Sequence, residues 1–353
     1  MTDITEGAIA RPLRRQASLS ALVPALAALL AVSMVASIGF GAVNIAPSAV
    51  IGVMREWLFP TGAEMPWTRG TETIVLDLRI PRAILGALCG AGLAVVGAVL
   101  QNITRNPLAD PYLFGVSSGA SVGAVAVILY TGAFLGAMTL PLAAFLGAIV
   151  SMMLVFVLAR EIGGFSTERL VLTGVAVHFV LMAATNVLIF NSMERGADAA
   201  MFWMLGGFGG ARWKLLPAPL VAVVIGTAWV MYRARALDAL SLGDEGAHSL
   251  GIAVKRLRME RFAATALLTG VLVSACGAVG FVGLIIPHVA RWVAGAEMRR
   301  SLPVAALMGG LFTVWVDVAA RLLLAPKELP LGVMTAAIGG LFFILMLRRR
   351  KAM

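Results

Sequence analysis

The sequence predicts an all-α polytopic membrane protein with about ten transmembrane helices and both termini in the cytoplasm. Of its 353 residues, 60% are hydrophobic and only 13% are charged, and the mean hydropathy is +0.94. Soluble domains contain about 25% charged residues. The 38 glycines agree with a membrane protein, because small residues let transmembrane helices approach closely. This composition excludes a water-soluble globule and a disordered chain.

Windows without charged side chains mark the spans, because about 20 apolar residues cross the hydrocarbon core of a bilayer. The window 111–159 is too long for one helix and divides between Gly132 and Pro141, and the window 262–290 divides at Gly277. The helices are therefore expected at 21–43, 83–104, 113–131, 139–160, 170–191, 215–233, 262–277, 281–296, 302–325 and 330–347.

The basic residues orient the chain, because cytoplasmic loops are enriched in Lys and Arg. With the N-terminus inside, roughly two thirds of the 28 Lys and Arg fall in cytoplasmic segments. Topology thus accounts for the net charge of +10, and no basic patch is interleaved with aromatic residues, so no nucleic-acid partner is expected. The first apolar stretch, 21–43, exceeds the length of a signal-peptide core and is expected to remain as a span.

A single transmembrane domain at 21–347 is expected between a cytoplasmic N-terminal segment at 1–20 and a cytoplasmic tail at 348–353. Two connecting segments are too long for simple turns. The first is the outer segment 44–80. The second is the inner loop 234–257, in which leucines at helical spacing are interrupted by glycines, so that two short amphipathic helices are expected. This loop is either a surface connector or a docking element for a cytoplasmic partner.

No catalytic or metal site is expected from the sequence, which has neither a phosphate-binding Gly-x4-Gly-Lys-Ser/Thr loop nor a His/Cys/carboxylate cluster with metal-ligand spacing. Asp317 and Arg321 lie four residues apart in one span and can pair, as a structural or a functional element. Arg79 and Arg82 precede the second span and are expected to face water. There they anchor either carboxylates of a partner or the membrane interface.

Six longer motifs stand out in the sequence: Arg79-Ile-Pro-Arg-Ala, Gly90-Ala-Gly-Leu-Ala-Val-Val-Gly-Ala-Val-Leu-Gln, Arg105-Asn-Pro-Leu-Ala-Asp-Pro-Tyr-Leu-Phe-Gly-Val-Ser-Ser-Gly-Ala, Trp203-Met-Leu-Gly-Gly-Phe-Gly-Gly, Phe281-Val-Gly-Leu-Ile-Ile-Pro-His and Glu328-Leu-Pro-Leu-Gly-Val. These motifs resemble those of the FecCD family of permeases, the membrane subunits of ABC importers for iron–siderophore complexes, haem and vitamin B12. They occur in the family's order between about residue 15 and residue 350. The resemblance implies ten spans with both termini cytoplasmic, in agreement with the charge distribution.

The resemblance also implies partners. A homodimer in a bacterial inner membrane is expected to work with two cytoplasmic ATPase subunits, which carry ATP and Mg, and with a periplasmic substrate-binding protein. The chain itself is expected to bind no cofactor and to be no enzyme. The expected cargo is an iron chelate, a siderophore or haem. Cobalamin import by the same mechanism is the alternative, and an ion-coupled secondary transporter is a more distant one.

Individual roles follow from the same resemblance. Docking of the binding protein is expected at Arg79, Arg82 and Arg321. The fifth and tenth spans are expected to line the translocation path, with Thr173, His178 and Asn186 on the fifth; His178 is either a haem ligand or a hydrogen-bonded core residue. ATPase coupling is expected at Asp238, Leu240, Leu242, Gly243, Asp244, Glu245, Gly246, Leu250 and Gly251. The cytoplasmic gate is expected at Asn106, Pro107, Leu108, Ser166 and Thr167.

Overall fold

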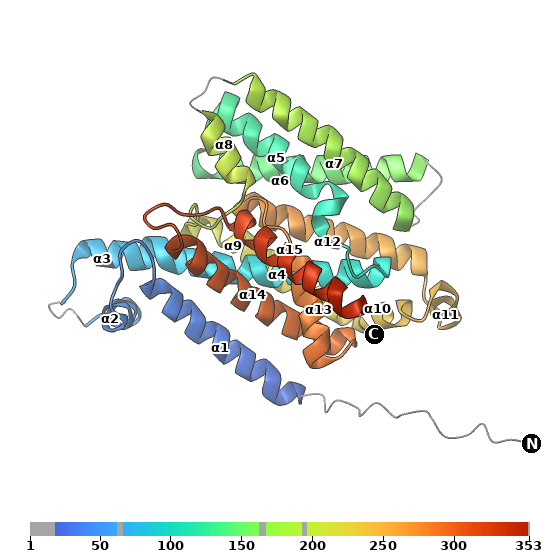
Figure 1. Cartoon of the computed structure of the whole chain (residues 1–353), viewed down its shortest axis with the longest axis horizontal. Coiled ribbons are helices and arrows are strands. Elements are labelled where there is room, and N and C mark those ends of the chain that lie inside the picture. The colour runs from blue at the N-terminus through green and yellow to red at the C-terminus, as the bar shows by residue number, and fades with distance from the viewer. Residues whose placement is uncertain (1–17, 62–65, 162–166, 193–195, 352–353) are drawn as a thin grey trace, which may run out of the picture.

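The computed structural model describes residues 18–61, 66–161, 167–192 and 196–351, and within these ranges every regular element is a helix (Figure 1). The all-α fold class is therefore confirmed. The helices are α1 (Leu19–Gly39), α2 (Pro47–Leu58), α3 (Arg69–Thr73), α4 (Ile80–Thr104), α5 (Val116–Ala126), α6 (Thr139–Glu161), α7 (Thr167–Phe190), α8 (Ala197–Met204), α9 (Pro217–Tyr232), α10 (Ala234–Leu240), α11 (Asp244–Ser249), α12 (Val254–Cys276), α13 (Val282–Ala294), α14 (Met298–Leu322) and α15 (Leu331–Lys351).

Seven helical stretches in the described residues are long and apolar enough to cross a membrane. Three shorter apolar helices, Val116–Thr131, Val282–Ala294 and Leu331–Met346, occupy the remaining windows that the sequence assigns to spans. The expected number of about ten spans therefore depends on counting these shorter helices. The helix α12 starts at Val254, well before the expected 262, because the charged residues that precede the apolar window are helical too.

The core is organised around α4, most of whose side chains are buried against α14, α13, α12 and α9. Two pairs of glycines make the close approach possible. A Cβ atom on Gly90 would lie 2.1 Å from the carbonyl oxygen of Gly309 in α14, and one on Gly97 would lie 1.9 Å from that of Gly283 in α13. The backbones of the three helices are thus in direct contact, as small residues allow in membrane proteins.

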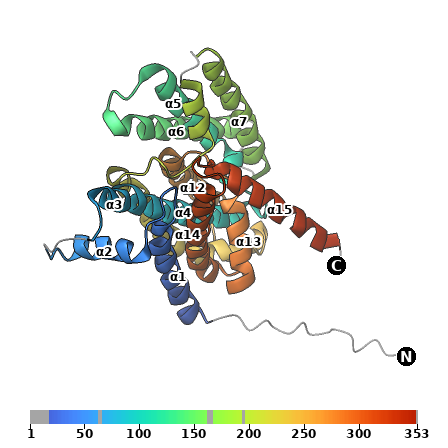
Figure 2. The ribbon, with the colours of Figure 1, turned by 60° about the vertical axis from the view of Figure 1, so that its left-hand side comes forward.

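A second group of helices, α5, α6, α7 and α8, lies to one side of the α4 group in both views (Figures 1 and 2). The helices α5 and α6 approach through Gly119 and Gly147, and α7 packs on both of them. The helix α12 joins the two groups, because it contacts α6 and α5 on one face and α4 and α9 on another.

The two ends of the bundle differ. The start of α1 and the end of α15 lie at the same end as α10 and α11, and α2 and α3 lie at the opposite end (Figure 1). This arrangement agrees with an even number of spans and with the predicted short helices of the inner loop. The sequence gives no indication of α2, α3 or α8, which are too short or too polar to form apolar windows. The helix α2 is held by Val50 and Val53, which are buried against the outer end of the bundle.

Candidate functional site

At the outer end of the bundle, a cluster of charged side chains joins α4 and α14. Nε and Nη2 of Arg82 donate to the carboxylate of Asp317 at 2.9–3.1 Å, and Nη1 donates to Oε1 of Glu328 at 3.0 Å. Nε of Arg321 lies 3.1 Å from Oδ2 of Asp317, one helical turn away. The pairing of Asp317 with Arg321 that their spacing predicts is thus confirmed, and Asp317 serves two arginines at once.

Arg321 of this cluster and the neighbouring Arg79 hold the end of α1. Arg79 donates to the carbonyl oxygens of Ile38 at 2.6 Å and Gly39 at 3.1 Å, and to that of Val43. Arg321 donates to the carbonyl oxygen of Phe40 at 2.6 Å. The carbonyl groups of Ile38, Gly39 and Phe40 are those that α1 leaves without intrahelical partners at its C-terminus, and Val43 belongs to the segment that follows.

The expectation that both arginines before the second span face water is wrong for Arg79, which is 9% exposed and bonded to backbone carbonyls. Arg321 is 6% exposed. Of the three arginines expected to dock a partner, Arg82 has the most accessible side chain, with 14% exposed. Glu328 lies 246 residues after Arg82 in the sequence and is not expected as a site residue, because its motif does not indicate which residue it contacts.

At the opposite end, the helices α10 and α11 form an elbow at Gly243, whose φ of 102° is readily adopted only by glycine. Asp244 at the start of α11 accepts two hydrogen bonds of 2.8 Å from Arg258 of α12 and another from Arg105, which follows α4. Hydrogen bonding to Arg258 is the main cause that lowers the pKa of Asp244. Nε of Arg105 also donates to the carbonyl oxygen of Leu240 at 3.0 Å, so two helices of the bundle fix the elbow.

The elbow is also attached to α14. Oδ1 of Asp238 in α10 accepts a hydrogen bond of 2.7 Å from the backbone N–H of Met298, the first residue of α14. Burial raises the pKa of Asp238. Leu240 is fully buried, whereas Leu242 and Leu250 are exposed on the elbow. The coupling residues expected from the sequence therefore divide into an anchored set and an exposed set. Glu245 and Gly251 are exposed as well, and Asp244 is both anchored and exposed.

The residues expected to form the cytoplasmic gate lie after α4. Oδ1 of Asn106 accepts the N–H of Leu108 at 2.9 Å and closes a turn, and Leu108 borders a large cavity. Pro107 borders a separate polar pocket together with Arg105. Thr167 is the first residue of α7, and Ser166 lies outside the described residues.

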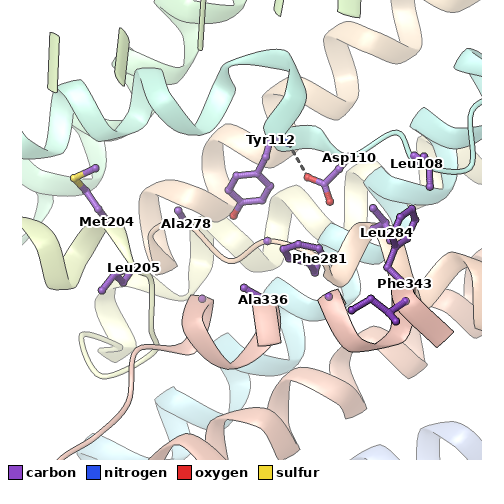
Figure 3. A pocket seen from close by; sticks show the side chains of 14 residues that line it. Leu108, Asp110, Tyr112, Met204, Leu205, Ala278, Phe281, Leu284, Ala336 and Phe343 are labelled. Carbon is purple, nitrogen blue, oxygen red and sulfur yellow. Dashed lines mark hydrogen bonds between the residues drawn. The ribbon is translucent and has the colours of Figure 1, made fainter. Parts of the chain in front are cut away.

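The large cavity has a volume of about 810 Å³ and lies between α15, the start of α13 and the connection from α4 to α5 (Figure 3). Asp110 and Tyr112 are its polar side chains; Oδ1 of Asp110 accepts the backbone N–H of Tyr112 at 2.9 Å. Burial raises the pKa of Asp110 to about 6. Helix α15, the tenth expected span, contributes Gly332, Ala336, Gly340, Phe343 and Ile344.

The path residues expected on the fifth span lie elsewhere. Among the described residues that border this cavity, none comes from α7. Thr173 is buried, and Asn186 is exposed on α7. Nδ1 of His178 is buried and has no hydrogen-bond partner among the described residues, and its ring meets that of Phe179 edge-on at 5.6 Å. The core hydrogen bond considered for His178 is therefore not formed by Nδ1.

A polytopic helical bundle with an apolar cavity, an inner elbow and an outer cluster of charged side chains fits a membrane permease, and its motifs resemble those of ABC importer permeases. The chain belongs to the FecCD transport family, whose model matches residues 29–349.

Two relatives and one solved structure show the extent of the similarity. The cobalamin import permease BtuC of Halobacterium salinarum is 44% identical over 281 residues, which cover 79% of this chain and 74% of that protein. The vitamin B12 import permease BtuC of Vibrio cholerae is 40% identical over 293 residues, covering 83% and 87%. An inward-facing structure assigned to a metal-chelate type ABC transporter matches with a TM-score of 0.80 at 27% identity, covering 93% and 99%.

Proposed function

We propose that this chain is the permease subunit of a vitamin B12 importer in a bacterial inner membrane. The observation that carries this proposal is the 40% identity to the Vibrio cholerae vitamin B12 permease over most of both chains. The same comparisons give less support to an iron chelate, which the sequence interpretation places first, than to cobalamin, its alternative. The metal-chelate transporter is related more distantly, at 27% identity.

The cavity volume of about 810 Å³ supports the proposal that the cargo is bulky and is bound weakly. Its described lining is mostly apolar and includes no histidine or cysteine that could ligate the metal of a chelate. A transport path has to release its cargo, and a lining without strong ligands favours release. In the proposed homodimer, the α15 helices of the two copies would border a shared path.

The two ends of the bundle fit the proposed partners. Glu328 already occupies one N–H group of Arg82, so a carboxylate on the periplasmic binding protein would compete with Glu328 for this arginine. At the inner end, the exposed Leu242 and Leu250 offer apolar contacts to an ATPase subunit, and the anchored Asp244 holds them in place. Docking through Arg79 or Arg321 would require release of the α1 carbonyl groups.

The test is uptake into proteoliposomes that contain this permease with its ATPase subunit and binding protein. Radiolabelled cyanocobalamin, a ferric hydroxamate siderophore and haem are compared, with ATP inside and with proton and sodium gradients collapsed. We expect uptake of cyanocobalamin that requires both ATP and the binding protein. Uptake of an iron chelate without uptake of cyanocobalamin would overturn the cargo proposed here, and cobalamin uptake that needs an ion gradient instead of ATP would overturn the mechanism.

A further inference from the structure

An apolar groove runs along the outside of the bundle between α9 and α12, away from the cavity assigned to transport. Its volume is about 680 Å³. It is floored by small residues, and a Cβ atom on Gly226 would lie 3.2 Å from a methyl group of Leu268. Glu260 is the one charged residue among its described lining. The lining residues are Met152, Val221, Ala222, Ile225, Gly226, Trp229, Glu260, Ala263, Ala264, Leu267, Leu268 and Val271.

At one end, the groove meets a pocket of about 470 Å³ that is bordered by three arginines, Arg233, Arg235 and Arg256. Glu260 connects the two spaces, since its carboxylate lies 2.9 Å from Nε of Arg256 and 3.7 Å from Nη1 of Arg233. Two of the three guanidinium groups thus face one carboxylate, and no Asp or Glu is among the described residues that border the pocket, so the pocket carries excess positive charge. The side chain of Arg256 is 81% exposed, so most of its N–H groups are open to a further acceptor.

The length and polarity of the groove match one leaflet of a bilayer. From Val221 to Arg233, α9 rises about 18 Å at about 1.5 Å per residue. Half of the hydrocarbon core is about 15 Å thick. Trp229 and Tyr232 lie near the arginines, as aromatic side chains do at the level of lipid headgroups. The charge distribution of the chain assigns this end to the cytoplasm.

We propose that the groove between α9 and α12 binds an anionic phospholipid of the cytoplasmic leaflet, with an acyl chain along the groove and the phosphate on the three arginines. Charge complementarity favours this occupant, because basic pockets at helix ends attract anionic headgroups and arginine donates to phosphate through a planar fork. An acyl chain is the apolar partner that a membrane supplies to a groove on the outside of the bundle. This site is independent of the cargo and of the path.

The test is native mass spectrometry of the full-length permease, released from detergent in the presence of phosphatidylglycerol, phosphatidylethanolamine or glycerol 3-phosphate. We expect one phosphatidylglycerol per chain to survive delipidation. The double variant Arg233→Gln/Arg256→Gln should bind it about 25-fold more weakly, at about fivefold for each arginine removed. Ala264→Trp fills the groove without a change in charge and should also release the lipid. Binding of glycerol 3-phosphate alone with the same affinity would overturn the role of the groove.

Matched controls separate the lipid site from general effects on the protein. Arg160→Gln removes an exposed arginine at the cytoplasmic end of α6, and Val224→Trp adds a bulky side chain to an exposed position of α9 outside the groove. Both should keep phosphatidylglycerol. Thermal unfolding and size-exclusion profiles confirm that every variant is folded. Equal retention of phosphatidylglycerol in all variants would overturn the proposal. Loss of dimers or of ATPase binding, with lipid retained, would overturn it too and assign the surface to a protein contact.

Discussion

Replacing Asp317 with alanine tests what holds the outer ends of α4 and α14 together. The carboxylate of Asp317 is contacted by Arg82 at 2.9 Å and by Arg321 at 3.1 Å, and the side chains of Asp317 and Arg321 are each 6% exposed. Removing one partner of a buried ion pair costs about 3–5 kcal/mol, because the remaining charge loses its compensation. Since Arg321 keeps its carbonyl acceptors, we expect Asp317→Ala to lower the free energy of unfolding by about 3 kcal/mol.

The matched variant is Glu328→Ala, which also removes a carboxylate from Arg82. The side chain of Glu328 is 39% exposed, so its pair is screened by water, and the expected loss is below about 1 kcal/mol. Unfolding of both variants in mixed micelles, titrated with SDS and followed by tryptophan fluorescence, measures the difference. Equal losses for the two variants would refute the argument that burial sets the strength of these pairs.

Three further predictions concern single residues. Gly243→Pro should abolish co-purification with the ATPase subunit, because proline cannot adopt a φ of 102°, while the membrane domain still inserts; undiminished complex formation would contradict it. Gly97→Ala should destabilise the protein by about 3 kcal/mol in thermal unfolding, because its Cβ would lie 1.9 Å from a backbone oxygen. The same substitution at Gly340, which has open space around it, should be neutral or stabilising. Burial raises the pKa of Asp110 to about 6, so ionisation of this carboxyl destabilises the folded protein as the pH rises above about 4. Asp110→Asn should therefore stabilise the protein by up to about 3 kcal/mol at pH 7.5 and leave its stability unchanged at pH 4. An equal gain at both pH values would refute the assignment.

The spans could be predicted from the sequence because hydropathy acts over whole windows. All ten expected windows contain an apolar helix, and the glycine elbow of the inner loop also follows from local pattern. The helices α2 and α8 could not be predicted in this way, since their form depends on packing against the bundle rather than on an apolar stretch of their own. The outer segment 44–80, which is too long for a simple turn, contains both α2 and α3.

Site geometry was less accessible to sequence reasoning, since contacts between distant residues leave no local pattern. The contact between Arg105 and Asp244 joins positions 139 residues apart, and only Asp244 is expected as a site residue. Arg79 could be recognised by its motif before the second span, but its hydrogen bonds to the end of α1 could not be predicted from the sequence. A motif identifies which residue is required, and the fold decides which groups surround it.

The attachment of α14 at both of its ends has a mechanical consequence. Its first residue is bonded to Asp238 of the inner elbow, and Asp317 near its last turn holds Arg82. The helix has 25 residues and is about 37 Å long at about 1.5 Å per residue. If α14 tilted by about 5° as a rigid helix about its first residue, its far end would move by roughly 3 Å. That displacement would be as large as the distances of 2.9 and 3.1 Å that separate Asp317 from its two arginines, so a small tilt of α14 at the inner elbow would be felt at the charged cluster of the outer end.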